Sequence, residues 1–194
     1  MNKGQETRLI ILEAGLEMAT CLGLENVTIG ALAKATNMSK SGLFAHFRSK
    51  ENLQIEILNH AGRIYFDTVI APAIKKKAGV VRIKAFVTNW IAWEDKFSGG
   101  CIFVSSSVDY SNRPGNIRQH LLDLQVDWLE SLKKLADSAK KAGDFRSDAD
   151  SEQFAFELYA LMLGYHHYCK LLRYTIAKDR LSRALNRLLE EFQH

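Results

Sequence analysis

Proline, glycine and cysteine are scarce in this chain of 194 residues. Only 2 prolines and 12 glycines are present, which favours long helices over a turn-rich sheet protein. The 3 cysteines, Cys21, Cys101 and Cys169, stand far apart in the sequence. Such an odd and sparse set argues against a disulfide framework and for a reducing compartment.

Long hydrophobic runs are also absent. No apolar run approaches the ~18 residues that a membrane-spanning helix needs, and the residues from Met1 to Glu6 lack the apolar core of a signal peptide. We therefore expect no membrane partner and a cytoplasmic location. The chain has no glycine-rich phosphate loop, nucleophile elbow or metalloprotease histidine pair, so we expect neither an enzyme nor a cofactor.

Acidic residues are missing from the stretch between Asn26 and Lys50. Its charged residues are Lys34, Lys40, Arg48 and Lys50, so its formal charge equals the +4 of the whole chain. A basic segment of this kind fits either the phosphate backbone of DNA or a solvated protein face. Charge alone does not choose between them.

Three helices are predicted before residue 50. Apolar or small residues recur between Ile11 and Leu22 at the spacing of one helix face. Thr28 and then Ser39 each provide a helix N-cap flanked by a pair of apolar residues. Asn37, between them, tolerates a positive φ. The second short helix is expected from about Lys40 to Phe47, which completes a three-helix helix-turn-helix unit.

The remainder of the chain is also predicted to be helical, so the fold class is all-α. A fourth helix is expected to open at Ser49 and to fade near Pro72, because proline lacks the amide hydrogen of a helix interior. Further helices are expected over about 80–97, over 152–173 and over 178–193, with a short helix or turn at 103–108. A long helix that carries Leu121, Trp128 and Leu135 on one face is expected to end at Gly143.

The helix expected over 152–173 is apolar on most of its circumference. Phe154, Leu158 and Leu172 lie on one side of it, and Phe156 and Leu163 lie on another. Such a helix must be covered on more than one side. Together with the helix at 178–193, it either packs inside a monomer or forms a four-helix interface with a second copy.

The stretch from Val27 to Leu53, with the run Met38-Ser39-Lys40-Ser41-Gly42-Leu43-Phe44 at its centre, resembles the N-terminal DNA-binding domain of the TetR family of regulators. With the first helix, the resemblance covers about Leu9 to Leu53. The segment from Gly100 to Gly164 is similar to the regulatory half of one branch of that family.

This resemblance implies a homodimeric DNA-binding transcriptional regulator that dimerises through its last two helices. It implies a repressor that leaves a palindromic, double-stranded operator when a small ligand binds, although the position of the operator decides between repressor and activator. The domains expected are a helix-turn-helix domain at 1–50 and an effector-binding and dimerisation domain at 51–194.

The recognition helix of such a protein presents its N-terminal residues to base edges in the major groove. Lys40 can donate to guanine or to a phosphate, and Gly42 allows a close approach. Lys50 and the backbone amides beside it form a natural anion site. Phe44 stands where a tyrosine is common in the family, so a phenolic phosphate contact is missing. The predicted DNA-binding residues are Thr28, Lys34, Ser39, Lys40, Ser41, Gly42, Phe44, His46 and Lys50.

These residues also have simpler interpretations. Thr28 can act as a helix cap alone, Lys34 can be solvated, and His46 can be an ordinary surface histidine.

The resemblance also implies an effector pocket among the aromatic residues of the C-terminal half. An apolar cavity with a few polar groups suits a small, mostly apolar or aromatic effector. The predicted lining is Trp90, Trp93, Phe103, Trp128, Tyr159 and His166. The alternative is that these side chains belong to the hydrophobic core.

Two other site types are weighed from the residues themselves. His166, His167 and Cys169 suggest zinc, but ligands on adjacent positions of a helix cannot all point one way, so no metal is expected. Cys101 follows two glycines in a plausible loop, which would suit an oxidant sensor, whereas Cys21 is expected in the core.

Overall fold

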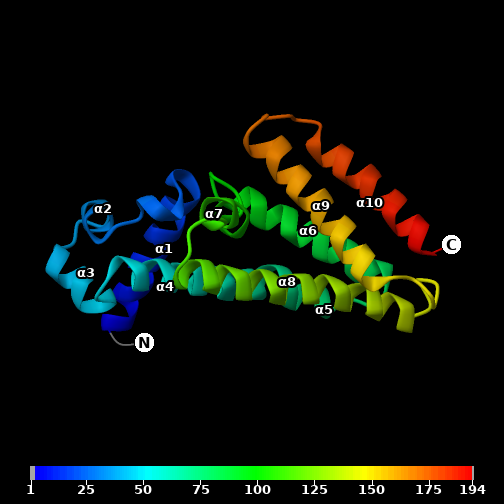
Figure 1. The fold of residues 1–194 in the computed structure, drawn as a ribbon, viewed down its shortest axis with the longest axis horizontal. Helices are drawn as coiled ribbons and strands as arrows, with labels where there is room; N and C mark the ends of the chain where they lie inside the picture. Colours follow the sequence, from blue (N-terminus) through cyan, green and yellow to red (C-terminus); the bar gives the residue numbers. More distant parts are fainter. Residues whose placement is uncertain (1–2, 194) are drawn as a thin grey trace. The chain divides into compact units, whose positions relative to one another are not determined.

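The computed structural model describes residues 3–193, and every regular element within them is helical, which confirms the all-α prediction. The described residues divide into two compact units. Unit 1 comprises the residues up to 66 together with 95–122, and unit 2 comprises 67–94 together with the residues from 123 onward. Figure 1 shows the elements in chain order.

Unit 1 begins with the predicted helix-turn-helix. Its elements are α1 (Lys3–Leu22), the short 3-10 helix η1 (Leu24–Asn26), α2 (Ile29–Ala35), α3 (Lys40–Phe47) and α4 (Lys50–Tyr65). The Thr28 hydroxyl accepts from the Ala31 amide at 3.1 Å, and the Ser39 hydroxyl accepts from the Gly42 amide at 3.1 Å. These bonds satisfy amides that the first turn of a helix leaves without partners. The predicted caps of α2 and α3 are therefore confirmed.

The turn between α2 and α3 is stabilised by local geometry and by the core beneath it. Asn37 adopts a φ of 54°, as expected, and the Met38 amide donates to the Ala33 carbonyl at 2.9 Å. Leu32, Leu43 and Phe47 are fully buried. These apolar side chains fix the orientation of α3, so the opposite face of α3 is left to solvent.

A segment far along the chain completes unit 1. Helix α7 (Ile102–Tyr110) packs against α1 and α4. The turn before it approaches α1 so closely that a Cβ on Gly99 would lie 1.6 Å from the Thr20 carbonyl oxygen. Ser98 also donates to Glu17 at 2.9 Å. Unit 1 is therefore larger than the helix-turn-helix segment expected over 1–50.

The path after α4 differs from the prediction of one helix that fades near Pro72. The α-helix ends at Tyr65, a π-helical segment covers Phe66–Ile70, and α5 covers Ala71–Ile74. Pro72 lies in the first turn of α5, where a missing amide hydrogen costs nothing because that amide has no intrahelical partner. The proline thus starts a new helix instead of ending the old one.

Unit 2 contains α6 (Val80–Lys96) up to Glu94, α8 (Asn116–Lys141) from Asp123 onward, α9 (Ser151–Lys170) and α10 (Ala177–Gln193). Helices α9 and α10 run side by side in opposite directions (Figure 1). The rings of Phe145, Phe154 and Phe192 meet pairwise with centroids 5.1–5.7 Å apart. This aromatic cluster packs the end of α10 against the start of α9.

Helix α9 is shorter than the predicted 152–173. It ends at Lys170, and the chain leaves the helical path at Arg173, whose φ is 57°. Leu172, which the sequence pattern placed on the helix, lies in the connection to α10 and is exposed. The apolar periodicity thus extends beyond the helix itself.

Candidate DNA-binding interface and effector region

One face of α3 is buried and the other is open to solvent. Leu43 and Phe47 have no exposed surface, whereas Lys40, Ser41 and Phe44 are exposed. The Phe44 side chain is 56% exposed, which is unusual for a phenylalanine on a well-packed helix. The exposed residues provide one cation, one hydroxyl and one apolar ring, a suitable set for reading a DNA groove.

Most of the other predicted DNA-binding residues lie at helix ends beside this face. Thr28 and Ser39 are the caps of α2 and α3, and Lys34 is exposed in the last turn of α2. His46 is half-buried, and its ring lies 6.1 Å from that of Phe47. The structure therefore gives Thr28 and Ser39 a capping role whether or not they contact DNA.

Gly42 has a local role that the sequence reasoning did not anticipate. A Cβ at this position would lie 3.1 Å from the Ser39 hydroxyl oxygen. The absence of a side chain therefore leaves room for the cap of α3 as well as for an approaching ligand.

Lys50 begins α4 and is already paired within the protein. Its ammonium lies 2.5 Å from Oε1 of Glu25 in η1. The other carboxylate oxygen of Glu25 accepts from the Tyr110 hydroxyl at 2.8 Å and lies 3.7 Å from the Arg113 guanidinium. The hydrogen bond from Lys50, with that from Tyr110, lowers the pKa of Glu25.

The sequence reasoning missed Glu25, Tyr110 and Arg113. The Glu25–Lys50 and Glu25–Tyr110 partners are 25 and 85 positions apart, so no short-range motif could identify the cluster. The acid-free stretch begins at Asn26, immediately after Glu25, so the charge pattern of that stretch does not include this carboxylate.

Five of the six predicted effector-binding residues lie in unit 2. Trp90 and Trp93 on α6 are fully buried. Trp128 on α8 packs against Phe86 with ring centroids 5.5 Å apart. The sixth residue, Phe103, belongs to α7 in unit 1, where its ring meets that of Tyr65 at 6.0 Å.

The remaining two predicted residues form polar contacts inside unit 2. The Tyr159 hydroxyl donates to the Gln125 side chain at 2.8 Å. Nδ1 of His166 lies 2.7 Å from a carboxylate oxygen of Glu94, whose side chain has no exposed surface. Trp90 lies one helical turn before Glu94, and its ring meets Tyr165 at 5.7 Å.

Glu94 is a further residue that the sequence did not predict. Burial of a carboxylate is costly unless a partner compensates it, and His166 provides such a partner for Glu94. The only signal in the sequence was an acidic residue on the apolar face of a helix.

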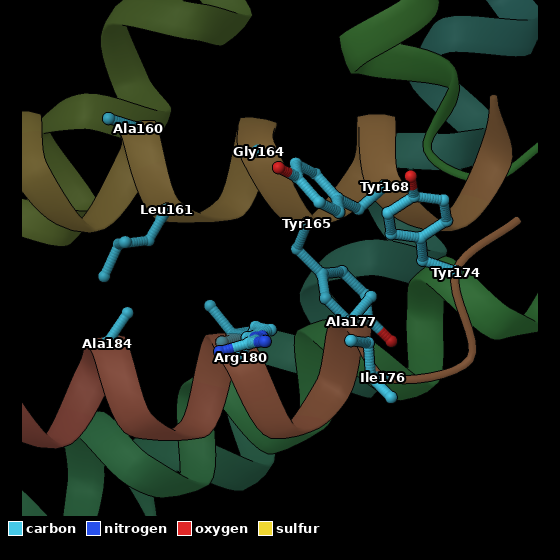
Figure 2. Close-up of a pocket in the computed structure, with 11 residues that line it drawn as sticks. Ala160, Leu161, Gly164, Tyr165, Tyr168, Tyr174, Ile176, Ala177, Arg180 and Ala184 are labelled. Carbon is cyan, nitrogen blue, oxygen red and sulfur yellow. The ribbon is translucent and has the colours of Figure 1, made fainter. Parts of the chain in front are cut away.

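A groove with a volume of about 450 Å³ lies between α9 and α10. Tyr165, Tyr168, Tyr174 and Arg180 are among its lining residues, and most of the remaining ones are small or aliphatic. Figure 2 shows the side chains of both helices around this space. None of the predicted effector-binding residues lines it.

The cysteines lie differently from the expectation. Cys21 is exposed, so its predicted place in the core is wrong, and Cys101 is buried as the residue before α7. Cys21 lies in the last turn of α1, off the helix face that carries the buried residues Leu16 and Ala19. Cys169 is of intermediate exposure.

Within residues 3–193, no group of three or more histidine, cysteine, aspartate or glutamate residues is arranged to hold a metal ion. In the same range, no helix is both long and apolar enough to cross a membrane.

Comparison with protein families identifies both halves of the chain. Residues 11–57 match the family described as "Bacterial regulatory proteins, tetR family", and residues 79–185 match "Tetracyclin repressor-like, C-terminal domain". A sequence search of curated proteins found no match.

Solved structures share the fold over nearly the whole chain. A TetR-family transcriptional regulator from Cytophaga hutchinsonii has a TM-score of 0.85 at 19% identity, with 100% of this chain and 98% of that one covered. A putative transcriptional regulator from Saccharomonospora viridis, in complex with choline, has a TM-score of 0.80 at 23% identity, with 96% of each covered. The reduced form of E. coli NemR has a TM-score of 0.79 at 20% identity, with 94% and 95% covered.

The capped pair α2–α3, the exposed face of α3 and the helical C-terminal half together define a helix-turn-helix DNA-binding protein. The chain belongs to the TetR family and is a DNA-binding transcriptional regulator. Members of this family bind operator DNA and dimerise, and repression with release by a ligand is typical of them.

Proposed function

We propose that this regulator is a homodimeric repressor that binds a palindromic operator through α3 and releases it when a small effector binds to the C-terminal half. Residues 1–50 form the DNA-binding domain, and residues 51–194 form the effector-binding and dimerisation domain. The protein acts in the cytoplasm, where bacterial operators are found, and it performs no catalysis and needs no cofactor.

The exposed face of α3 carries the DNA-binding part of this proposal. Lys40, Ser41 and Phe44 are open to solvent, while buried Leu43 and Phe47 hold the helix in place. The predicted Thr28 and His46 contacts fall beside the same face, where phosphate contacts would set the register of α3 in the groove.

Selection of bound DNA from a random pool, followed by footprinting, tests the proposal. A two-fold symmetric dimer selects a palindrome with half-site centres about one helical turn apart or a multiple of it. Recovery of a single asymmetric half-site, or of no preferred sequence, would contradict the proposal. The genes beside the selected sites then distinguish a repressor from an activator.

The dimerisation part is supported by α9. Its outward face carries Phe156 and Leu163, which are 68% and 37% exposed, with the small residues Ala160 and Gly164 exposed on the same face. Large exposed apolar side chains on one helix face mark an interaction site, and small residues on that face allow another helix to approach closely. The adjoining groove offers space for side chains of a second copy.

Leu163→Glu tests this interface. Burial of the new charge between two copies should convert dimers to monomers in analytical ultracentrifugation. Val108→Glu is the matched control, because Val108 is 72% exposed and lies on α7. An Leu163→Glu protein that remains dimeric would place the interface elsewhere.

The effector part is supported by the aromatic and polar residues of unit 2. Trp90, Trp93, Trp128, Tyr159 and His166 supply ring surface and a few polar atoms, as small-molecule sites require. The choline complex of the Saccharomonospora viridis regulator is a precedent for a small organic ligand on this fold. The effector of the present chain is accordingly proposed to be a small, mostly apolar or aromatic molecule.

Intrinsic fluorescence offers a direct test, because the chain's 3 tryptophans all belong to the predicted set. Compounds that change the emission are then titrated into the operator complex by calorimetry. A true effector weakens operator binding, and the operator weakens effector binding by the same factor. Independent binding of the two would refute the release mechanism.

Oxidant sensing through Cys101 is a second candidate. The observation in its favour is that Cys101 immediately precedes α7, and helix N-termini stabilise thiolates. Burial of its side chain argues for slow access. Operator binding after peroxide treatment is compared between wild type, Cys101→Ser and the exposed-cysteine control Cys21→Ser. Loss of operator binding that only Cys101→Ser prevents would support this candidate, and unchanged wild-type binding would exclude it.

A further inference from the structure

The ion pair between Lys50 and Glu25 places an acidic side chain beside a proposed phosphate contact. The ammonium and the carboxylate oxygen lie 2.5 Å apart, and the two side chains are 39% and 46% exposed. A DNA phosphate that approaches the start of α4 must therefore compete with Glu25 for the same ammonium.

Glu25 is held in place by groups other than Lys50. Tyr110, at the end of α7, donates its hydroxyl to Oε2 at 2.8 Å. The Arg113 guanidinium lies 3.7 Å from the same oxygen and 5.6 Å from the Tyr110 ring centroid. These two partners keep the carboxylate near Lys50, and they remain to stabilise its charge when Lys50 turns away.

We propose that Glu25 is an affinity-determining residue that competes with DNA phosphate for Lys50, with Tyr110 and Arg113 as the groups that position it. The inference rests on the proposed function, specifically on the phosphate contact of Lys50. When the phosphate contact forms, Lys50 exchanges the Glu25 carboxylate for the phosphate. The contact therefore contributes less to the free energy of DNA binding than the same contact from an unpaired lysine would. The carboxylate stays satisfied in both states.

A double-mutant cycle on DNA binding tests this competition. Wild type, Glu25→Gln, Lys50→Met and the double variant are titrated with a labelled operator and with a non-operator duplex, at several salt concentrations. Glu25→Gln should tighten binding to both duplexes by about two- to five-fold per protomer, the range for an exposed ion pair. In the Lys50→Met background the same substitution should change affinity by less than two-fold.

Two control variants separate competition from other effects of the substitution. Glu51→Gln removes the same charge from the neighbouring position, where the carboxylate accepts from Asn116 at 2.7 Å. Its effect, from general electrostatics alone, should be equal with and without Lys50. Tyr110→Phe removes a hydrogen bond that positions Glu25 but leaves the charge, so it should tighten DNA binding by less than Glu25→Gln does, and only when Lys50 is present.

The outcomes distinguish this inference from the proposed function. Lys50→Met should weaken binding and reduce the salt slope by about one unit per contact; an unchanged slope would contradict the phosphate contact itself. A weakened Lys50→Met protein beside an unaffected Glu25→Gln protein would overturn the competition alone. The competition would also be overturned if Glu25→Gln had the same effect on DNA binding with and without Lys50.

Discussion

The close approach of Gly99 to α1 leads to a quantitative prediction for Gly99→Ala. A Cβ at this position would lie 1.6 Å from the Thr20 carbonyl oxygen and 2.2 Å from its carbon. Real Cβ atoms stay at least 3.0 Å from such atoms. The φ of Gly99 is not positive, so the clash, and not backbone strain, makes glycine necessary here.

Relief of this clash requires the turn before α7 to move away from α1 by more than 1 Å, since both clashing atoms are backbone atoms. The movement also breaks the hydrogen bond from Ser98 to Glu17. Overpacking costs about 1–3 kcal/mol, and a lost hydrogen bond about 0.5–1.5 kcal/mol. We therefore expect Gly99→Ala to lower the free energy of unfolding by about 2–4 kcal/mol.

Urea denaturation at a fixed protein concentration measures this change, with Gly62→Ala as the matched control. Gly62 lies inside α4, and a Cβ there would meet nothing within 4 Å. Alanine should therefore stabilise that helix by about 0.5–1 kcal/mol. A Gly99→Ala protein within about 0.5 kcal/mol of wild type would refute the packing argument.

Three further predictions concern single side chains. Lys40→Ala should leave the urea midpoint unchanged, because Lys40 is exposed, but should weaken operator binding in an anisotropy titration. Burial lowers the pKa of His60, so the unfolded state binds a proton more readily than the folded state. The free energy of unfolding is therefore unaffected by this group above pH about 6.5 and decreases as the pH falls below that value. Denaturation at several pH values should show this loss in wild type and not in His60→Gln. His166→Leu should lower the free energy of unfolding by about 1–3 kcal/mol, because it removes the imidazole that hydrogen-bonds the buried Glu94 carboxylate. The double variant Glu94→Leu/His166→Leu should recover most of that loss, and a double variant as unstable as the single one would contradict this view of the pair.

Local signals in the sequence were sufficient for the helix-turn-helix. The caps Thr28 and Ser39 act on amides three residues away, and Leu32 and Leu43 each lie on the buried face of their own helix. Interactions of this range depend on the nearest few residues, so they can be predicted from the pattern alone. The observed α3, Lys40–Phe47, therefore has the predicted bounds.

Helix ends that depend on other elements were predicted less well. The apolar pattern that includes Leu172 continues past the true end of α9 at Lys170, because periodicity reports which residues are apolar and not where the backbone turns. The core position expected for Cys21 was wrong for a similar reason. Near a helix terminus, the neighbouring elements decide which side is covered.

By itself, the sequence determined the all-helical class, the two short helices of the DNA-binding unit and the residues on the exposed face of α3, because each depends on short-range periodicity and capping. Only the tertiary structure decided that the turn at Gly99 packs on α1, that Glu25 pairs with Lys50 and Tyr110, and that Glu94 is buried against His166. The contact between Glu25 and Tyr110 joins residues 85 positions apart, and the contact between Glu94 and His166 joins residues 72 positions apart. At such separations the chain has no local preference for a partner, and only the packing of whole helices selects one.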